Sequence, residues 1–112
     1  QALVTLNDEQ FVEASRAFAQ RILQSSAKSF PDRLDWAFEL ATGHPADSIR
    51  KEVLKDAHTF QNKVFKNEPD RAEELLKIGE TPRDKSIPAQ EHATWTVLAS
   101  MILNLDETLN RE

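Results

Sequence analysis

Apolar residues recur at intervals of three and four along most of the chain, and this spacing constrains the fold more than any other feature. Over residues 9–24 they form one helical stripe at Phe11, Ala14, Phe18 and Ile22. No stretch alternates apolar and polar residues convincingly, as a half-buried strand would. The pattern predicts an all-α fold, a single domain of about five helices packed as an irregular bundle.

Capping and helix-breaking residues set the expected helix ends. Asn7 and Asp8 favour the N-cap of the first helix, and Asp47 or Ser48 favours that of the third. Gly43 suits a left-handed C-cap. The expected helices are residues 9–24, 31–42, 47–66, 69–79 and 88–103, and the stretch 104–106 can interrupt the last one before a final turn.

Two of these helices carry long apolar stripes that we expect to face the core. The third helix, expected to be the longest, has its stripe at Ile49, Val53, Leu54, Ala57, Phe60 and Val64. The last helix has its buried side at Trp95, Leu98, Met101, Ile102 and Leu105.

The composition excludes several classes of function for these 112 residues. The absence of cysteine excludes a disulfide scaffold, a thiolate metal site, a cysteine nucleophile and covalent haem attachment. With 14 Lys and Arg against 19 Asp and Glu, the net charge of -5 argues against nucleic-acid binding. No apolar run approaches the roughly 20 residues that span a bilayer. We therefore expect no nucleic-acid partner and no membrane span.

The residues that usually carry chemistry are present but not assembled by any motif. His44, His58 and His92 lack metal-ligand spacing, and each is expected to have a structural or surface role. The many carboxylates lie on expected surfaces or in the loop of residues 79–88, where solvation is favoured over an acid–base pair. The sequence thus assigns no catalytic, cofactor-binding or metal-binding residue.

Five residues are the candidates for an interaction or loop site. Trp95 lies on a helical stripe and is expected in the core, whereas Trp36 lies off its stripe and is the better candidate for an exposed or interface aromatic. The acidic residues flank turns. The candidate set is Trp36, Glu80, Asp84, Asp106 and Glu107.

Three strings resemble one bacterial family. Residues 1–14 (QALVTLNDEQFVEA) are similar to the QALxLLNDPxFVEAAR stretch of a planctomycete family, and residues 37–45 (AFELATGHP) to its A(F/Y)xLxxGRxP. GETPRD at 79–84, Trp95 and LNLDE at 103–107 resemble its GESPxD…W…LLNLDEFLTRE. The departures, such as His44 in place of Arg, are mild. The resemblance spans essentially the whole chain.

The resemblance implies a context and no chemistry. The family is a C-terminal domain of unknown function in large multidomain proteins that often begin with a signal peptide and a cytochrome-c-like domain. It implies that this chain is a fragment of an exported or periplasmic protein, with any haem in another domain. The family has no settled activity, so no catalytic residue is carried over.

Three hypotheses follow for the function. The leading one is a non-catalytic helical module that packs against upstream domains of its parent or against another protein; the oligomeric state is left open. The alternative is a segment of a glycan-degrading or redox enzyme, to whose active site Glu80, Asp84, Asp106 and Glu107 contribute. The weakest is binding of a small ligand or glycan near Trp36.

Overall fold

Five helices make up the described part of the chain. The computed structural model describes residues 8–110, and for residues 106–110 the helical backbone alone. The helices are α1 (Glu9–Gln24), α2 (Phe30–Thr42), α3 (Ser48–Asn67), α4 (Pro69–Leu76) and α5 (Ala89–Asn110). Residues 8–110 contain no strand, so the prediction of an all-α bundle of about five helices is confirmed.

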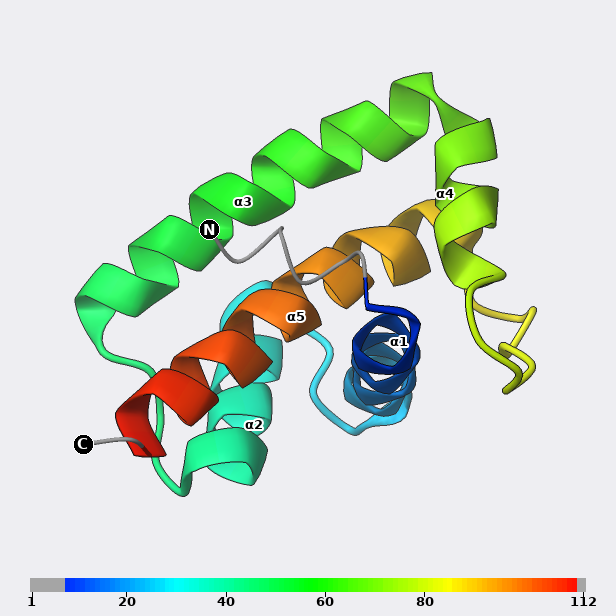
Figure 1. Ribbon diagram of the computed structural model, residues 1–112. Helices are drawn as coiled ribbons and strands as arrows, with labels where there is room; N and C mark the ends of the chain where they lie inside the picture. The colour runs from blue at the N-terminus through cyan, green and yellow to red at the C-terminus, as the bar shows by residue number, and fades with distance from the viewer. Residues whose placement is uncertain (1–7, 111–112) are drawn as a thin grey trace.

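α5 is the central element, and each of the other four helices packs against it (Figure 1). All nine residues from 92 to 100 are buried. The buried hydroxyls of Thr94, Thr96 and Ser100 donate to carbonyl oxygens three or four residues earlier in α5, so they need no outside partner. The interruption expected at residues 104–106 does not occur, because α5 continues to Asn110. No helix of the described residues is both long and apolar enough to cross a membrane.

The core consists of two clusters along α5. The larger one surrounds Trp95, which confirms the prediction that this aromatic is buried, and takes side chains from α1, α2, α3 and α5. The smaller one joins α3, α4 and α5 through Phe65, Ala72, Leu76, Ala93 and Val97. Burial of these side chains from water is the main stabilising contribution to the bundle.

The capping residues act as the sequence predicts at three helix ends. The Asp8 carboxylate accepts hydrogen bonds from two N–H groups in the first turn of α1, and Asp47 caps α3 in the same way. Gly43 ends α2 with φ of 90°. α4 ends at Leu76, earlier than expected, because the N–H groups of Lys77 and Ile78 turn back to carbonyls three residues before them.

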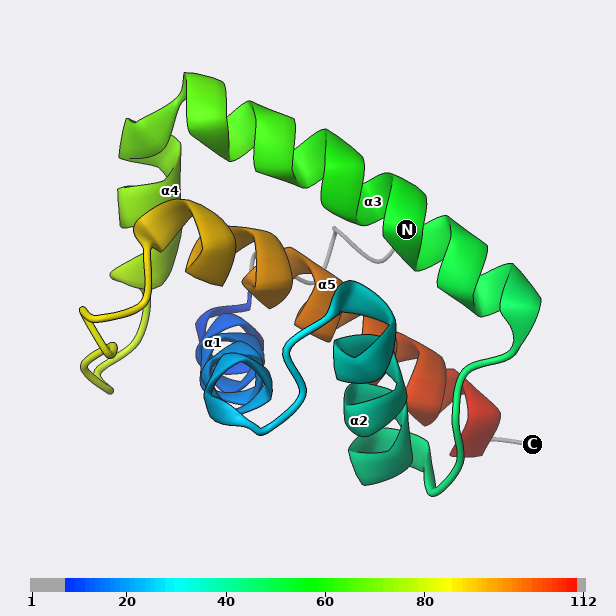
Figure 2. The same ribbon diagram turned by 180° about the vertical axis from the view of Figure 1, so that it is seen from behind.

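The prediction of a core-facing stripe on α3 is wrong for its largest side chains. Ile49, Val53 and Phe60 are 75%, 52% and 63% exposed, whereas Leu54 is fully buried. α3 packs mainly against α5 and α4, with a few side-chain contacts to α2, and Figures 1 and 2 show it along one edge of the molecule. At 100° per residue, Leu54 and Phe65 lie on the side that meets α5, so the other three lie on the outer side.

Candidate functional site

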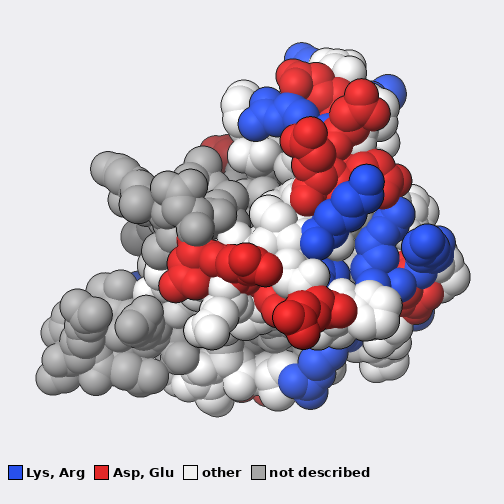
Figure 3. All heavy atoms as spheres, turned by 45° about the vertical axis from the view of Figure 1, so that its right-hand side comes forward, with Lys and Arg blue, Asp and Glu red and all other residues white. Residues whose placement is uncertain are grey.

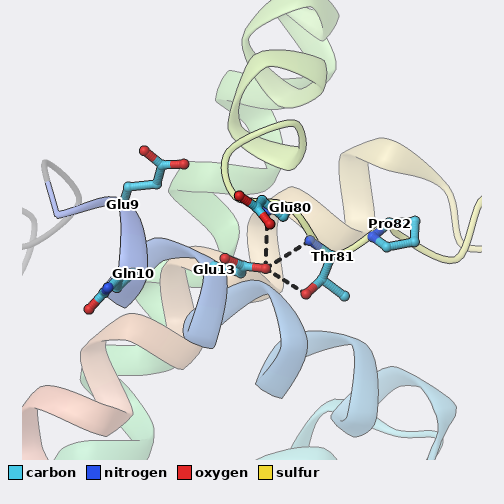
Figure 4. Close-up of a pocket in the computed structure, with 6 residues that line it drawn as sticks. All are labelled: Glu9, Gln10, Glu13, Glu80, Thr81 and Pro82. Atoms are coloured by element: carbon cyan, nitrogen blue, oxygen red, sulfur yellow. Dashed lines mark hydrogen bonds between the residues drawn. The ribbon is translucent and has the colours of Figure 1, made fainter.

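The α4–α5 loop (residues 77–88) is fastened to α1 by the carboxylate of Glu13. This carboxylate accepts hydrogen bonds from the backbone N–H groups of Glu80 (3.1 Å) and Thr81 (2.8 Å) and from the Thr81 hydroxyl. Figure 4 shows the three contacts converging on one carboxylate oxygen. The Thr81 hydroxyl and backbone N–H lower the pKa of Glu13 below its ordinary value, so Glu13 acts as an ionised acceptor.

Gly79 makes room for this contact. Its φ is 94°, in the left-handed region that favours glycine. A Cβ at this position would lie 2.6 Å from the carboxyl carbon of Glu13, which is closer than carbon atoms pack. The loop therefore needs glycine both for its backbone conformation and for the approach of Glu13.

Arg16, one turn along α1, holds the same loop from below the surface. Its side chain is only 3% exposed, and its guanidinium donates to the carbonyl oxygens of Ile78 (2.8 Å) and Thr81 (2.7 Å). The backbone carbonyl of Arg16 lies 3.2 Å from Nε2 of His92 on α5. A carbonyl only accepts, so His92 carries its proton on Nε2. These contacts tie α1, α5 and the loop together.

His92 is fully buried, and its surroundings favour the neutral imidazole. Burial lowers its pKa, which the hydrogen bond to the Arg16 carbonyl opposes. Its Nδ1 has no hydrogen-bond partner in the described structure. His58 is half-buried against the rings of Phe30 and Trp95, with centroids 4.9 and 5.9 Å away, and His44 is exposed.

Two of the five candidate residues lie in the loop. Asp84 is engaged in a turn, where its carboxylate accepts from the N–H and hydroxyl of Ser86 and from the Gln24 side chain. The Ser86 hydroxyl, with help from Gln24, lowers the pKa of Asp84. Glu80 is exposed and lines an open pocket of about 620 Å³ between the loop and the first turns of α1. The lining residues are Glu9, Gln10, Glu13, Glu80, Thr81 and Pro82.

The other three candidates do not join them. Trp36 is half-buried on α2 against the larger core cluster, and Figure 1 shows α2 toward the opposite end of α5 from the loop. The side chains of Asp106 and Glu107 lie outside the described residues. The structure therefore brings Glu80 and Asp84 into one loop and places Trp36 elsewhere.

The loop site offers a polar surface and few means of catalysis. Glu13 is fixed as an acceptor and Asp84 is held in its turn, so neither is placed to donate a proton. Among the described residues no group of three or more His, Asp or Glu can hold a metal ion. Figure 3 shows acidic and basic side chains interleaved on the face that carries α4 and the loop. No family model, curated protein or solved structure matches the chain.

The outer face of α3 is the second candidate site, and the sequence reasoning missed it. Ile49, Val53 and Phe60 lie within about 40° of one another around the helix, so they form one apolar stripe. The same stripe was expected in the core. The available signal was that Leu54 and Phe65 point about 130° away from it around the helix, so the apolar residues of α3 form two faces and not one stripe.

Proposed function

We propose that these residues form a non-catalytic helical module that packs against protein through the outer face of α3. The observation that carries the proposal is the exposure of Ile49, Val53 and Phe60 on one helix face. Full burial of a side chain of this size contributes roughly 1.5–3 kcal/mol. Burial of all three against a partner would therefore contribute substantially to the binding free energy. Contiguous exposed apolar surface in a folded protein commonly marks an interaction site.

The loop site supports a structural role for its charged residues. The side-chain hydrogen bonds of Glu13 and Arg16 are all made to the loop, and they fix its backbone. Within the GETPRD string that resembles the planctomycete family, Gly79 and Thr81 (serine in the family) belong to this fastening, and Asp84 caps a turn. Turn and capping chemistry explains these residues without a ligand.

The resemblance supplies the setting for this module. It places such a module at the C-terminal end of a large exported protein, so the proposed partners are upstream domains of the same polypeptide or another protein. Any haem of that protein would lie in a different domain. These points are proposals by resemblance.

Thermal unfolding tests the docking. We expect a higher unfolding midpoint for the module within the longer protein that the resemblance implies than for the 112 residues alone, because docking stabilises the folded state. The matched control is Phe60→Asp, which should remove the increase while leaving the midpoint of the 112 residues unchanged at low protein concentration. Equal midpoints in both settings for the unmodified chain would contradict the proposal.

A second candidate function is a contribution to an active site shared with upstream domains. The position of Glu80 favours this function, because its exposed carboxylate lines an open pocket beside Glu9 and Gln10. Alanine substitution of Glu80, Asp84, Asp106 and Glu107 in the longer protein would then abolish its glycan-degrading or redox activity. Unchanged activity would exclude this function.

A further inference from the structure

The four large side chains of the apolar stripe on α3 are placed symmetrically about a midpoint between Asp56 and Ala57. Val53 precedes this point by as many residues as Phe60 follows it. Ile49 and Val64 are related in the same way. An antiparallel copy of α3 therefore sets Val53 against Phe60 and Ile49 against Val64. From this self-complementarity we infer that two copies of the chain form a two-fold symmetric dimer through α3, an inference that rests on the proposed function.

The shape of this face permits two helices to meet. Figures 1 and 2 show α3 along one edge of the molecule, and no described helix lies over its outer side. The centre of the stripe is Ala57, a small side chain whose own core contacts leave it half-buried. Apolar residues spaced four, four, three and four apart form the kind of seam along which helices pair side by side.

The charges beside the stripe also favour a second copy. Glu52 and Lys63 are exposed on the same flank of α3, and neither makes an ion pair within residues 8–105. A two-fold axis perpendicular to the helices keeps equal flanks together, so Glu52 of each copy meets Lys63 of the other. The dimer thus gains two identical ion pairs that no single chain can form. An unrelated partner would carry such a matched pattern only by coincidence.

One residue opposes the pairing. Asp56 lies on the same flank next to the axis, so its carboxylate faces that of the second copy, and like charges repel. The contact is also confined to one face of a single helix in each copy, whereas a standard interface takes about 20–30 residues from each partner. We therefore expect a weak dimer whose population depends on protein concentration.

Sedimentation of the 112-residue chain with charge-exchange variants tests the pairing and its register. Glu52→Lys and Lys63→Glu should each weaken the dimer at least several-fold, and the double variant should restore it. Asp56→Asn should strengthen it, and Phe60→Asp should abolish it. A monomer at all concentrations, or a double variant no tighter than the single ones, would overturn the inference.

An introduced cysteine gives an independent readout, because the chain has none of its own. Asp56→Cys, beside the two-fold axis, should form a disulfide-linked dimer on mild oxidation. Lys55→Cys, on the side of α3 that faces away from the stripe, should not. Equal cross-linking of both variants would overturn the inference. If the chain is monomeric but its unfolding midpoint still rises within the longer protein, the pairing fails and the proposed function stands. If the midpoint does not rise either, both fail.

Discussion

At the scale of single residues, two charged side chains of α1 define how the α4–α5 loop lies. Glu13 and Arg16 occupy one side of the helix one turn apart, and their contacts reach residues 62 to 68 positions away in the sequence. Arg16 is buried, and hydrogen bonds from a charged group to carbonyl oxygens are worth roughly 1.5–3 kcal/mol each. The loop is therefore an ordered part of the fold.

Substitution of Gly79 is the sharpest test of the contact between Glu13 and the loop. Gly79→Ala should lower the free energy of unfolding by more than the about 1–2 kcal/mol that a left-handed alanine costs, because its Cβ also meets the Glu13 carboxyl group. Gly43→Ala is the matched control: its φ is also positive, 90°, but a Cβ there has no atom within 4 Å. Urea denaturation of both variants measures the difference. Equal losses would contradict the close contact between Glu13 and Gly79.

Glu13 should make the stability depend on acid pH. Its pKa is lower in the folded chain than the ordinary value of 4.5, chiefly through Thr81. The stability it contributes is thus present above about pH 4.5 and is lost as the pH falls through the lower, folded pKa. Urea unfolding across this range should show a shallower pH dependence for Glu13→Gln than for the unmodified chain. A parallel dependence in both would contradict the ionised contact.

His92 should also make the stability depend on pH, in a higher pH range than Glu13. Burial lowers its pKa below 6.5, so the unfolded chain takes up the proton first as the pH falls. The stability is thus fully present above about pH 6.5 and declines below it. We expect His92→Gln, whose amide can still donate to the Arg16 carbonyl, to flatten this decline. His58, whose pKa burial also lowers, should account for the remainder.

At the scale of elements, the helices follow from local sequence and the choice of buried face does not. Asp8, Asp47 and Gly43 mark helix ends because a cap acts within a few residues, and helical periodicity is equally local. The fastening of Glu13 and Arg16 to the loop joins distant positions and leaves no periodic pattern. The sequence therefore predicted Glu80 and Asp84 as loop residues but not the side chains of α1 that hold the loop.

α3 shows why the buried face was missed. Its longer stripe, which includes Ile49, Val53 and Phe60, has the more regular spacing, but Leu54 and Phe65 are the residues that meet the core. The helices that contact α3, chiefly α5 and α4 with α2 at one side, leave part of its circumference uncovered. Periodicity identifies apolar faces, and the number of neighbouring elements decides which face is buried.

Substitutions on the two faces of α3 should have opposite consequences. Leu54→Ala should lower the free energy of unfolding by about 2–5 kcal/mol, because it leaves a cavity in the core. Phe60→Ala should change it by no more than about 0.5 kcal/mol at low protein concentration, since the ring is exposed. Urea denaturation under identical conditions compares them. A large loss for Phe60→Ala would place its ring in the core.

At the scale of the whole molecule, α5 is the central axis, with residues 92–100 all buried, and α3 is an outer helix with a second apolar face. The loop site is held together internally, whereas the α3 face has no partner among the described residues. The two features divide the molecule into a part that maintains the fold and a part available for contact. This division is the reason for our proposal that the outer face of α3 carries the function.

The most direct test of this assignment is a dilution series of amide chemical shifts of the 112-residue chain. We expect concentration-dependent shifts that gather at outward positions of α3 between Ile49 and Val64 and are absent from the Phe60→Asp variant. The α4–α5 loop and the surroundings of Trp36 should not change. Shifts gathered at the loop or around Trp36 would contradict association through α3, and no shift at any concentration would contradict pairing of two copies through it.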